Sequence, residues 1–394
     1  MTDPNVNPQM PNDPGAPENT DEQYVSPDRA ESLADEAAES EAFEAAQDPE
    51  AEDPLSSAST MTDAEIEDAV EAELPLAKYL ASTEKRVRDR AIRSLSAFLL
   101  RSAQEGGLAM SPLEIAKLWK GIFYCFWMSD KPLVQQALAQ ELANLVLYVA
   151  GQGADVETEL DEKHSEARAL SALDFFHGFW VTMEAEWLGI DKFRINKYYL
   201  LMRRMVHAAL VLLQTHGWKE PILQRFVLVM GGKDGPLAAN NVRVPESITY
   251  HVCDIFLDEL ERVAQAEEGR IPMLPLLIPF LSLAAKSTSK RVYERVMGSV
   301  ITPFLDAAQK AIRGKETDYP ALLAHAAIST EDDGDEEDED DEDDDEEDGD
   351  DDQKRIAKLR RSILRAAFMI ASGSDTYAPS RRKLYALWQA EMQP

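Results

Sequence analysis

Apolar side chains recur at intervals of three and four residues through most of residues 74–330, the spacing that places them on one face of an α-helix. Short polar or proline-containing segments divide this pattern into separate helices. No pairing of strands is expected from it. The predicted helices cover residues 76–99 (broken near 82–83), 112–128, 132–149, 166–188, 191–215, 219–229, 247–266, 273–285, 290–312 and 320–328, with polar loops at 151–165 and 230–244.

Several helix ends carry recognisable signals. Ser111 precedes Pro112, and Glu114 follows three positions after the serine, which predicts an N-terminal capping box. The segment 129–132 ends this helix and starts the next one. Asp191 is predicted to cap the helix that continues to Thr215.

Consecutive helices with broad apolar faces and short connections are typical of helical hairpins stacked side by side. The sequence shows no strict repeat period, so any HEAT-like character is degenerate. We therefore predict an all-α fold, an irregular HEAT-like helical solenoid, with disordered acidic arms.

Aromatic residues concentrate in two blocks, residues 118–135 and 175–204, which hold four of the six tryptophans. At helical spacing most of these aromatic side chains fall on apolar faces. We expect them to form core that joins neighbouring helices, while the charged residues between them face partners.

Charge is distributed unevenly along the chain, whose net charge is −33. Residues 1–73 contain 22 Asp or Glu and one Arg, and residues 331–352 contain 20 acidic residues and two glycines. Such segments cannot bury enough apolar surface to fold. We predict a disordered acidic arm at 1–73 (with a possible short helix at 64–74), an all-helical domain at 74–330 and an acidic disordered tract at 331–352.

Residues 353–394 carry nine Lys or Arg against two acidic residues. Their apolar positions predict two basic amphipathic helices, at 354–372 and 380–391. Such helices beyond a tether either pack back on the body or dock on a partner. The sequence leaves both options open.

Cysteine use and hydropathy bear on the compartment. Cys125 and Cys253 both lie within apolar patterns, which indicates buried free thiols in a reducing compartment. The sequence has no secretory signal at its start and no apolar run of the roughly 18 residues that span a bilayer. We expect a soluble intracellular protein that does not associate with membranes.

The sequence offers little support for catalysis. His177, Glu184 and Glu186 do not have the spacing of a metal or acid–base site, and a polar network between helices is the simpler interpretation. Residues 231–235 resemble a phosphate loop only superficially, without the required spacing or a preceding strand. We expect no enzyme activity, no catalytic, cofactor or metal site, and no small-molecule substrate.

Basic residues form four clusters that could bind RNA phosphates or proteins, although a solvated face is the simpler alternative. The candidate contact residues are Lys85, Arg86, Arg90, Arg93, Lys131, Lys192, Arg194, Lys197, Arg203, Arg204, Lys290, Arg291, Arg360 and Arg361. The acidic tract has three possible uses: a solubilising tail, a mimic of nucleic acid that occupies basic partners, or an intramolecular mask for the adjacent basic helices.

The segment LWKGIFYCFWMSDKP at 118–132 resembles the most recognisable stretch of the eukaryotic nucleolar ribosomal-RNA-processing protein 1 family. Residues 76–82 and 87–91 resemble its opening helix, and residues 179–199 resemble its second block, so that the resemblance covers about 74–283. The acidic tract and the chain ends are not part of it.

This resemblance implies an all-helical, non-enzymatic assembly factor of the nucleolus that scaffolds pre-60S particles during processing of large-subunit pre-rRNA. Its expected partners are other large-subunit assembly factors and pre-rRNA. The sequence keeps one alternative open, a chaperone or adaptor that uses the acidic tract to bind basic ribosomal or histone proteins.

Overall fold

Helices follow the predicted periodicity through the described part of the chain, which comprises residues 76–104, 108, 110–152, 162–267, 269–329 and 349–392 of a computed structural model. The first helices are α3 (Leu76–Leu80), α4 (Lys85–Gln104), α5 (Pro112–Trp127), α6 (Pro132–Val149), α7 (Glu162–Glu186), the short 3₁₀ turn η2 (Trp187–Gly189), α8 (Ile195–Thr215) and α9 (Glu220–Gly231). They are followed by α10 (Glu246–Ala264), β1 (Ile271–Pro272), α11 (Met273–Lys286), α12 (Lys290–Val296), the π-helical turn η3 (Met297–Ile301), α13 (Thr302–Ile312), α14 (Pro320–His325), β2 (Ala326–Ala327), α15 (Gly349–Ser372) and α16 (Ala378–Met392).

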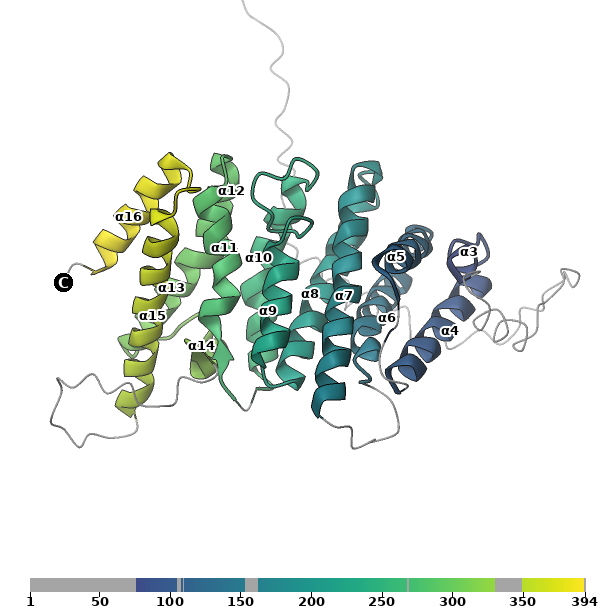
Figure 1. Cartoon of the computed structure of the whole chain (residues 1–394), viewed down its shortest axis with the longest axis horizontal. Helices are drawn as coiled ribbons and strands as arrows, with labels where there is room; N and C mark the ends of the chain where they lie inside the picture. The colour runs from purple at the N-terminus through teal and green to yellow at the C-terminus, as the bar shows by residue number, and fades with distance from the viewer. Residues whose placement is uncertain are drawn as a thin grey trace, which may run out of the picture. The chain divides into compact units, whose positions relative to one another are not determined.

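The helices form two layers, because each one packs against the helix two positions further along the chain. One layer contains α3, α5, α7, α9 and α11, and the other contains α4, α6, α8, α10 and α12. Figure 1 shows these helices side by side from α3 and α4 at one end to α15 and α16 at the other. The predicted all-α solenoid is confirmed for the described residues. The predicted arm at 1–73, with its short helix, and residues 331–348 of the acidic tract lie outside them.

The predicted helix signals act as expected at α4 and α5. The break at Ser82-Thr83 separates α3 from α4. At the start of α5, the Ser111 hydroxyl accepts a hydrogen bond from the backbone N–H of Glu114, and the Ser111 N–H donates to the Glu114 carboxylate at 2.7 Å. These reciprocal bonds satisfy two of the donors that a helix start leaves open.

The Asp191 cap is shifted from the predicted position. The helix begins at Ile195, and Asp191 lies in the turn before it, where its carboxylate accepts from the backbone N–H groups of Phe193 and Arg194. The helix predicted over 290–312 is continuous but widens into the π turn η3. Pro303 has no N–H to donate four residues back, and a wider turn accommodates it.

Two short parallel segments depart from the expectation of no strands. Ile271 pairs with Ala326 and Pro272 pairs with Ala327. The helix predicted over 320–328 therefore ends at His325 and gives way to β2. A short apolar run can be buried either as a helix or as a strand, so periodicity alone could not distinguish the two.

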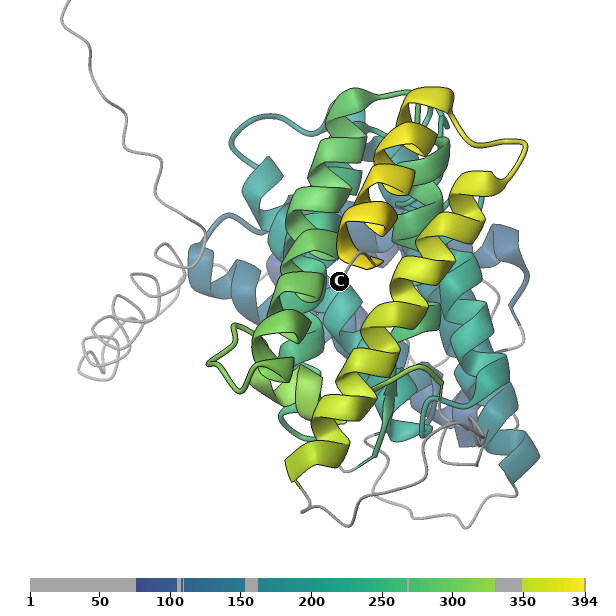
Figure 2. The same cartoon turned by 90° about the vertical axis from the view of Figure 1, so that its left-hand side faces the viewer.

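The C-terminal helices pack on the body, which resolves the alternative that the sequence left open. α15 packs against α11 and α13, and α16 packs against α15 and α11. The N–H of Tyr377, between α15 and α16, donates to the Ala285 carbonyl at 2.9 Å, and Lys286 pairs with Asp375 at 2.8 Å. Figure 2 shows both helices at the C-terminal end of the array.

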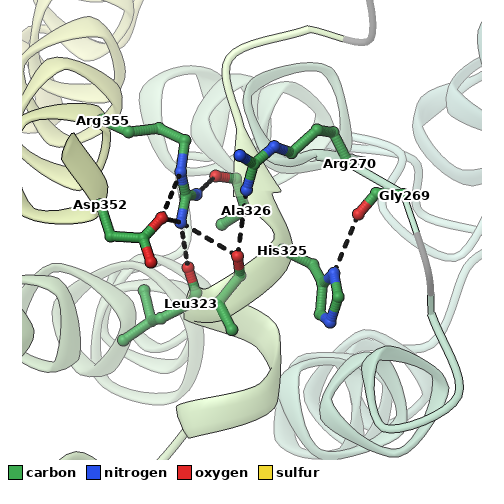
Figure 3. Close-up of polar contacts among 8 residues, drawn as sticks. Gly269, Arg270, Leu323, His325, Ala326, Asp352 and Arg355 are labelled. Atoms are coloured by element: carbon green, nitrogen blue, oxygen red, sulfur yellow. Dashed lines mark hydrogen bonds and ion pairs between the residues drawn. The ribbon is translucent and has the colours of Figure 1, made fainter. Parts of the chain in front are cut away.

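Arg355 fastens α15 to the segment that ends α14 (Figure 3). Its guanidinium donates to the carbonyls of Leu323, Ala324 and Ala326 and pairs with Asp352 at 2.8 Å. The sequence predicted an extended chain through residue 352, whereas α15 begins at Gly349. Aspartates in a first helical turn are favourable because they face the positive end of the helix dipole.

The aromatic blocks form core, as predicted, where α5 meets α7 and α8. Trp119 donates from Nε1 to the Phe175 carbonyl at 2.8 Å, and Tyr198 donates from Oη to the Phe123 carbonyl at 3.0 Å. The Phe123 and Tyr198 rings stack with centroids 4.8 Å apart. Both predicted buried thiols are also found, and burial raises the pKa of Cys125 to about 12.

Gly178 sets the distance between α5 and α7. A Cβ at this position would lie 2.3 Å from Ile115 Cγ2 and 2.9 Å from Trp119 Cδ1. Both neighbours are buried core, which adjusts only at a cost. The close approach of the two helices therefore depends on the absence of a side chain at this position.

The substitution Gly178→Ala should lower the free energy of unfolding by about 1–3 kcal/mol, because the overpacking outweighs the higher helix propensity of alanine. Urea denaturation measures this change. Gly298→Ala is the matched control, since a Cβ there meets no atom within 4 Å. Equal unfolding free energies for the two variants would contradict this account of Gly178.

Candidate partner-binding surface

Buried cations close the C-terminal end of α5 and fix the turn that follows it. Lys197 on α8 donates from Nζ to the carbonyls of Trp127 and Ser129, at 2.8 and 2.6 Å. Arg88 on α4 donates to the Ser82 carbonyl at 3.0 Å and reaches Met128 O at 3.5 Å. Carbonyls at a helix end lack partners within the helix, and positive charge is favourable there.

The α7–α8 connection is held rigidly against this turn. Arg194 pairs with the Asp191 carboxylate, and its guanidinium lies over the Trp127 ring, 4.8 Å from the centroid. On the other side, Trp187 donates from Nε1 to Ser247 Oγ at 2.9 Å. The connection is thus fastened to both α5 and α10.

Two large apolar side chains project from this rigid connection. Leu188 is 88% exposed and Phe193 is 84% exposed. Lys192 lies between them in sequence, with its Nζ 5.1 Å from the centre of the Phe193 ring. Lys131 is exposed in the neighbouring α5–α6 turn. We call Lys131, Leu188, Lys192 and Phe193 the connector surface.

A rigid, exposed Leu and Phe beside lysines are suited to binding a partner, since interface anchors are apolar side chains that need little ordering on association. Helical periodicity predicts that most aromatic residues of this block are core, and it does not single out Phe193 or Leu188. Their position in the connection, beside Gly189 and Asp191 and outside both helices, was the available signal.

Three rings, one each from η2, α8 and α10, pack in succession with tilted planes. The centroids of Trp187 and Tyr199 are 5.3 Å apart, and those of Tyr199 and His251 are 4.5 Å apart. His251 Nε2 lies 2.9 Å from the Tyr199 carbonyl. Burial lowers the pKa of His251 to about 4, against a smaller opposing effect of the hydrogen bond to Tyr199.

This pKa predicts a loss of stability in acid. The unfolded chain takes up a proton near pH 6.5 and the folded chain only near pH 4, so stability present above pH 6.5 is lost as the pH falls toward 4. Between pH 7.5 and pH 5, His251→Gln should lose on the order of 1–2 kcal/mol less unfolding free energy than the wild type. Urea denaturation at both pH values checks this, and parallel losses in the two proteins would refute it.

The structure does not gather the predicted contact residues at one site. Lys85, Arg86 and Arg93 are on α4, while Arg361 is on α15 at the opposite end of the array (Figure 1). The exposed candidates are Lys85, Arg86, Arg93, Lys131, Lys192, Lys290, Arg291 and Arg361, and the half-buried ones are Arg90, Arg194 and Arg204. Lys85 and Lys290 are paired along their own helices with Asp89 and Glu294.

Three of the candidates are buried. Lys197, Arg203 and Arg360 are 5%, 8% and 9% exposed, so their cationic groups face the interior. Lys197 binds backbone carbonyls, and Arg203 pairs with Glu259, which is fully buried. The sequence shows which basic residues cluster on one face of a helix, but it does not show which face the neighbouring helix covers.

The Arg203–Glu259 pair links α8 to α10 as part of a larger network. His207 Nδ1 lies 3.0 Å from Glu259 Oε2, and Arg262 lies 3.5 Å from Oε1. Burial alone would raise the pKa of Glu259, but His207, Arg203 and Arg262 together hold it below its usual value. The network is therefore an internal ion pair rather than a partner-binding site.

The residues considered for catalysis also have structural partners. Glu184 pairs with Arg243 at 2.8 Å, and Glu186 pairs with Lys120 at 3.1 Å. In the 231–235 loop, the Gly232 N–H donates to the Leu228 carbonyl instead of a ligand. Among the described residues, no cluster of His, Cys, Asp or Glu could hold a metal ion, and no helix is long and apolar enough to cross a membrane.

The described chain is an all-helical array with exposed apolar side chains at the α7–α8 connection. Residues 71–386 match the family described as "Nucleolar protein, Nop52". This match covers more than half of the chain, and the chain belongs to the Nop52 family of nucleolar proteins. Membership identifies the nucleolus as its location and supports a role in ribosome biogenesis.

Relatives agree with this assignment. Mouse ribosomal RNA processing protein 1 homolog A is 30% identical over 261 residues, which are 66% of this chain and 49% of the relative. Human homolog B is 33% identical over 60% of this chain and 28% of the relative. The Drosophila melanogaster homolog is 30% identical over 55% of this chain and 28% of the relative. The chain spans about half or less of the length of these relatives.

Proposed function

We propose that this protein is a non-enzymatic scaffold of pre-60S particles that is required for processing of large-subunit pre-rRNA. The observation that carries the proposal is the family match over residues 71–386, which includes nearly the whole described array. The names of its relatives, ribosomal RNA processing protein 1, point to the same process. Its partners are other large-subunit assembly factors, together with pre-rRNA through direct contacts.

The two-layer array suits a scaffold because each helix is braced by neighbours in both layers. Stable protein interfaces bury roughly 1,200–2,000 Å² in total, and a long array offers room for more than one. The connector surface supplies apolar anchors for a protein partner. The exposed cations at other positions supply phosphate contacts, whose strength falls with salt.

A scaffold acts on processing indirectly. By holding proteins and RNA in one arrangement, it favours the folded precursor on which separate processing enzymes act. Glu184 and Glu186 are consistent with this role, because both are held in ion pairs rather than poised to exchange protons with a substrate. The proposal requires no cofactor.

The connector surface provides a direct test. In cells depleted of the endogenous protein, large-subunit precursors should accumulate while small-subunit RNA stays normal. The double variant Leu188→Ser, Phe193→Ser should fold but bind particles at least about tenfold less, because buried apolar anchors dominate interface energy. It should therefore fail to restore processing. Sedimentation with precursor particles and RNA blots measure the two effects.

The matched control is Leu113→Ser, Val242→Ser, which removes two exposed apolar side chains elsewhere, 64% and 99% exposed. This control should sediment with particles and restore processing. Equal behaviour of the two double variants would reject the connector surface. Normal large-subunit processing after depletion would reject the scaffold itself.

A second candidate function is a chaperone or adaptor for basic ribosomal or histone proteins. It is favoured by the density of the acidic tract, with 20 acidic residues among residues 331–352. Such a run attracts basic proteins through its field, and that attraction is screened by salt. Arg355 binds the Ala326 carbonyl before the tract and the carboxylate of Asp352, the last residue of the tract, so these anchoring contacts do not involve residues 331–348.

Replacement of residues 331–348 by a Gly-Ser linker of equal length separates the two functions. The melting temperature should change by less than about 2 °C, because the anchoring contacts of Arg355 remain. The scaffold proposal expects large-subunit processing to continue. The chaperone function would be favoured instead if the linker variant no longer bound purified basic ribosomal proteins and also showed a processing defect.

A further inference from the structure

The cations of α15 fall into two groups with different surroundings. From Gln353 to Ser372 this helix contains six Lys or Arg residues and no Asp or Glu. Arg355 is committed to the carbonyls at the end of α14, and Arg360 is buried. The remaining four side chains are all exposed: Lys354, Lys358, Arg361 and Arg365.

These four residues share one face of the helix. They are separated by four, three and four positions, so at 100° per residue they fall within an arc of about 60°. At 1.5 Å per residue the row is about 16 Å long. Around the helix axis, Arg355 lies about 100° from Lys354 on one side, and Arg360 lies about 120° from Lys354 on the other. We call Lys354, Lys358, Arg361 and Arg365 the α15 stripe.

The opposite face of α15 is the one that packs on the body. Ile356, Leu359, Ile363 and Leu364 are buried there, against α11 and α13. Figure 2 shows α15 at the front of the C-terminal end of the array. The four side chains of the stripe are exposed. Packing thus accounts for the apolar residues of α15 and for Arg355 and Arg360, but not for Arg361 and Arg365.

The C-terminal half of the stripe, Arg361 and Arg365, is an unfavourable arrangement for the isolated fold. Like charges three and four residues apart on a helix repel each other. Arg361 and Arg365 form no hydrogen bond or ion pair with any described residue, so the fold gains nothing from them in return. A polyanionic partner would offset this repulsion.

We propose that the α15 stripe binds the phosphate backbone of RNA. Between Lys354 and Arg365 the arc presents no exposed apolar side chain, whereas a protein interface needs a desolvated apolar centre. An RNA strand carries one phosphate per nucleotide, and phosphate contacts are a main part of how proteins bind A-form RNA, so a row of about 16 Å is long enough to reach several phosphates. Arginine is well suited to bidentate phosphate contacts.

The inference rests on the proposed function for the source of the RNA, a precursor particle, but it is testable without one. The purified full-length chain is titrated against a fluorescein-labelled 20-nucleotide single-stranded RNA and the corresponding duplex, from 50 to 300 mM KCl. In the stripe variant, Lys354, Lys358, Arg361 and Arg365 are all changed to Gln. The control variant changes Lys163, Lys233, Arg313 and Lys315 to Gln; these cations are exposed on other elements, and the change in net charge is the same.

At 100 mM KCl the stripe variant should bind at least about tenfold more weakly than the wild type. Its slope of log K against log salt should fall by about 2 to 3, since each phosphate contact contributes about 0.7 for single strands. The control variant should stay within about twofold of the wild type. Circular dichroism and thermal unfolding check that both variants fold.

The same titrations are repeated with residues 331–348 replaced by the Gly-Ser linker, which removes the chain's own competing polyanion. A loss of affinity confined to the stripe variant, in either background, supports the proposal. Equal losses in the stripe and control variants, or none in both backgrounds, would overturn it. So would a stripe-dependent affinity for a 20-residue poly-glutamate peptide that exceeds the affinity for RNA.

Sedimentation with precursor particles separates this proposal from the scaffold. If the stripe variant binds RNA normally while the wild-type protein sediments with large-subunit precursors, only the stripe proposal fails. If stripe-dependent RNA binding is found but depletion leaves processing normal, the stripe stands and the scaffold fails.

Discussion

The contact of α5 with α7 and α8 is the constraint on which the described array and its candidate surface both depend. Gly178 lets α7 approach Trp119, and Tyr198 of α8 packs on Phe123, one turn further along the same face of α5. Adjacent helices in a solenoid share no extended ladder of hydrogen bonds, so side-chain packing and single side-chain hydrogen bonds must fix their distance and orientation. Tight packing of the helices also fixes the positions of the turns at their ends. The connector surface consists of residues from two of these turns, the α5–α6 turn and the α7–α8 connection.

Basic side chains serve two opposite purposes in this fold. Lys197, Arg88 and Arg355 point toward carbonyls at helix ends and tie one helix to the next. Removing such a cation would leave buried carbonyls without a partner, which costs more than an exposed ion pair contributes. Arg361 and Arg365 of the stripe are exposed and form no such contact with the described residues. Burial and hydrogen-bond partners, rather than the positive charge itself, distinguish structural cations from those available to a ligand.

This distinction explains which features of the fold and of the candidate surface could be predicted from the sequence. Apolar periodicity and the Ser111–Glu114 capping box are local signals, and the predicted helices and their order are confirmed over the described residues. The faces that neighbours cover are set by tertiary packing, so the candidates Lys197 and Arg203 could not be separated from exposed lysines. Phe193 was missed because an aromatic residue in an apolar block is usually core. The packing of α15 and α16 also depended on contacts distant in sequence.

The position of the acidic tract relative to α15 has an electrostatic consequence. Arg355 holds Ala326 and Asp352 together, so the chain leaves and re-enters the described fold at the N-terminal end of the helix that carries the stripe. Charges further apart than about 8–10 Å are largely screened at physiological ionic strength. Only acidic residues close to the stripe can therefore compete for it at any moment. An RNA strand aligned with the whole row releases counterions at every contact, and this release favours RNA over the tract most strongly at low salt.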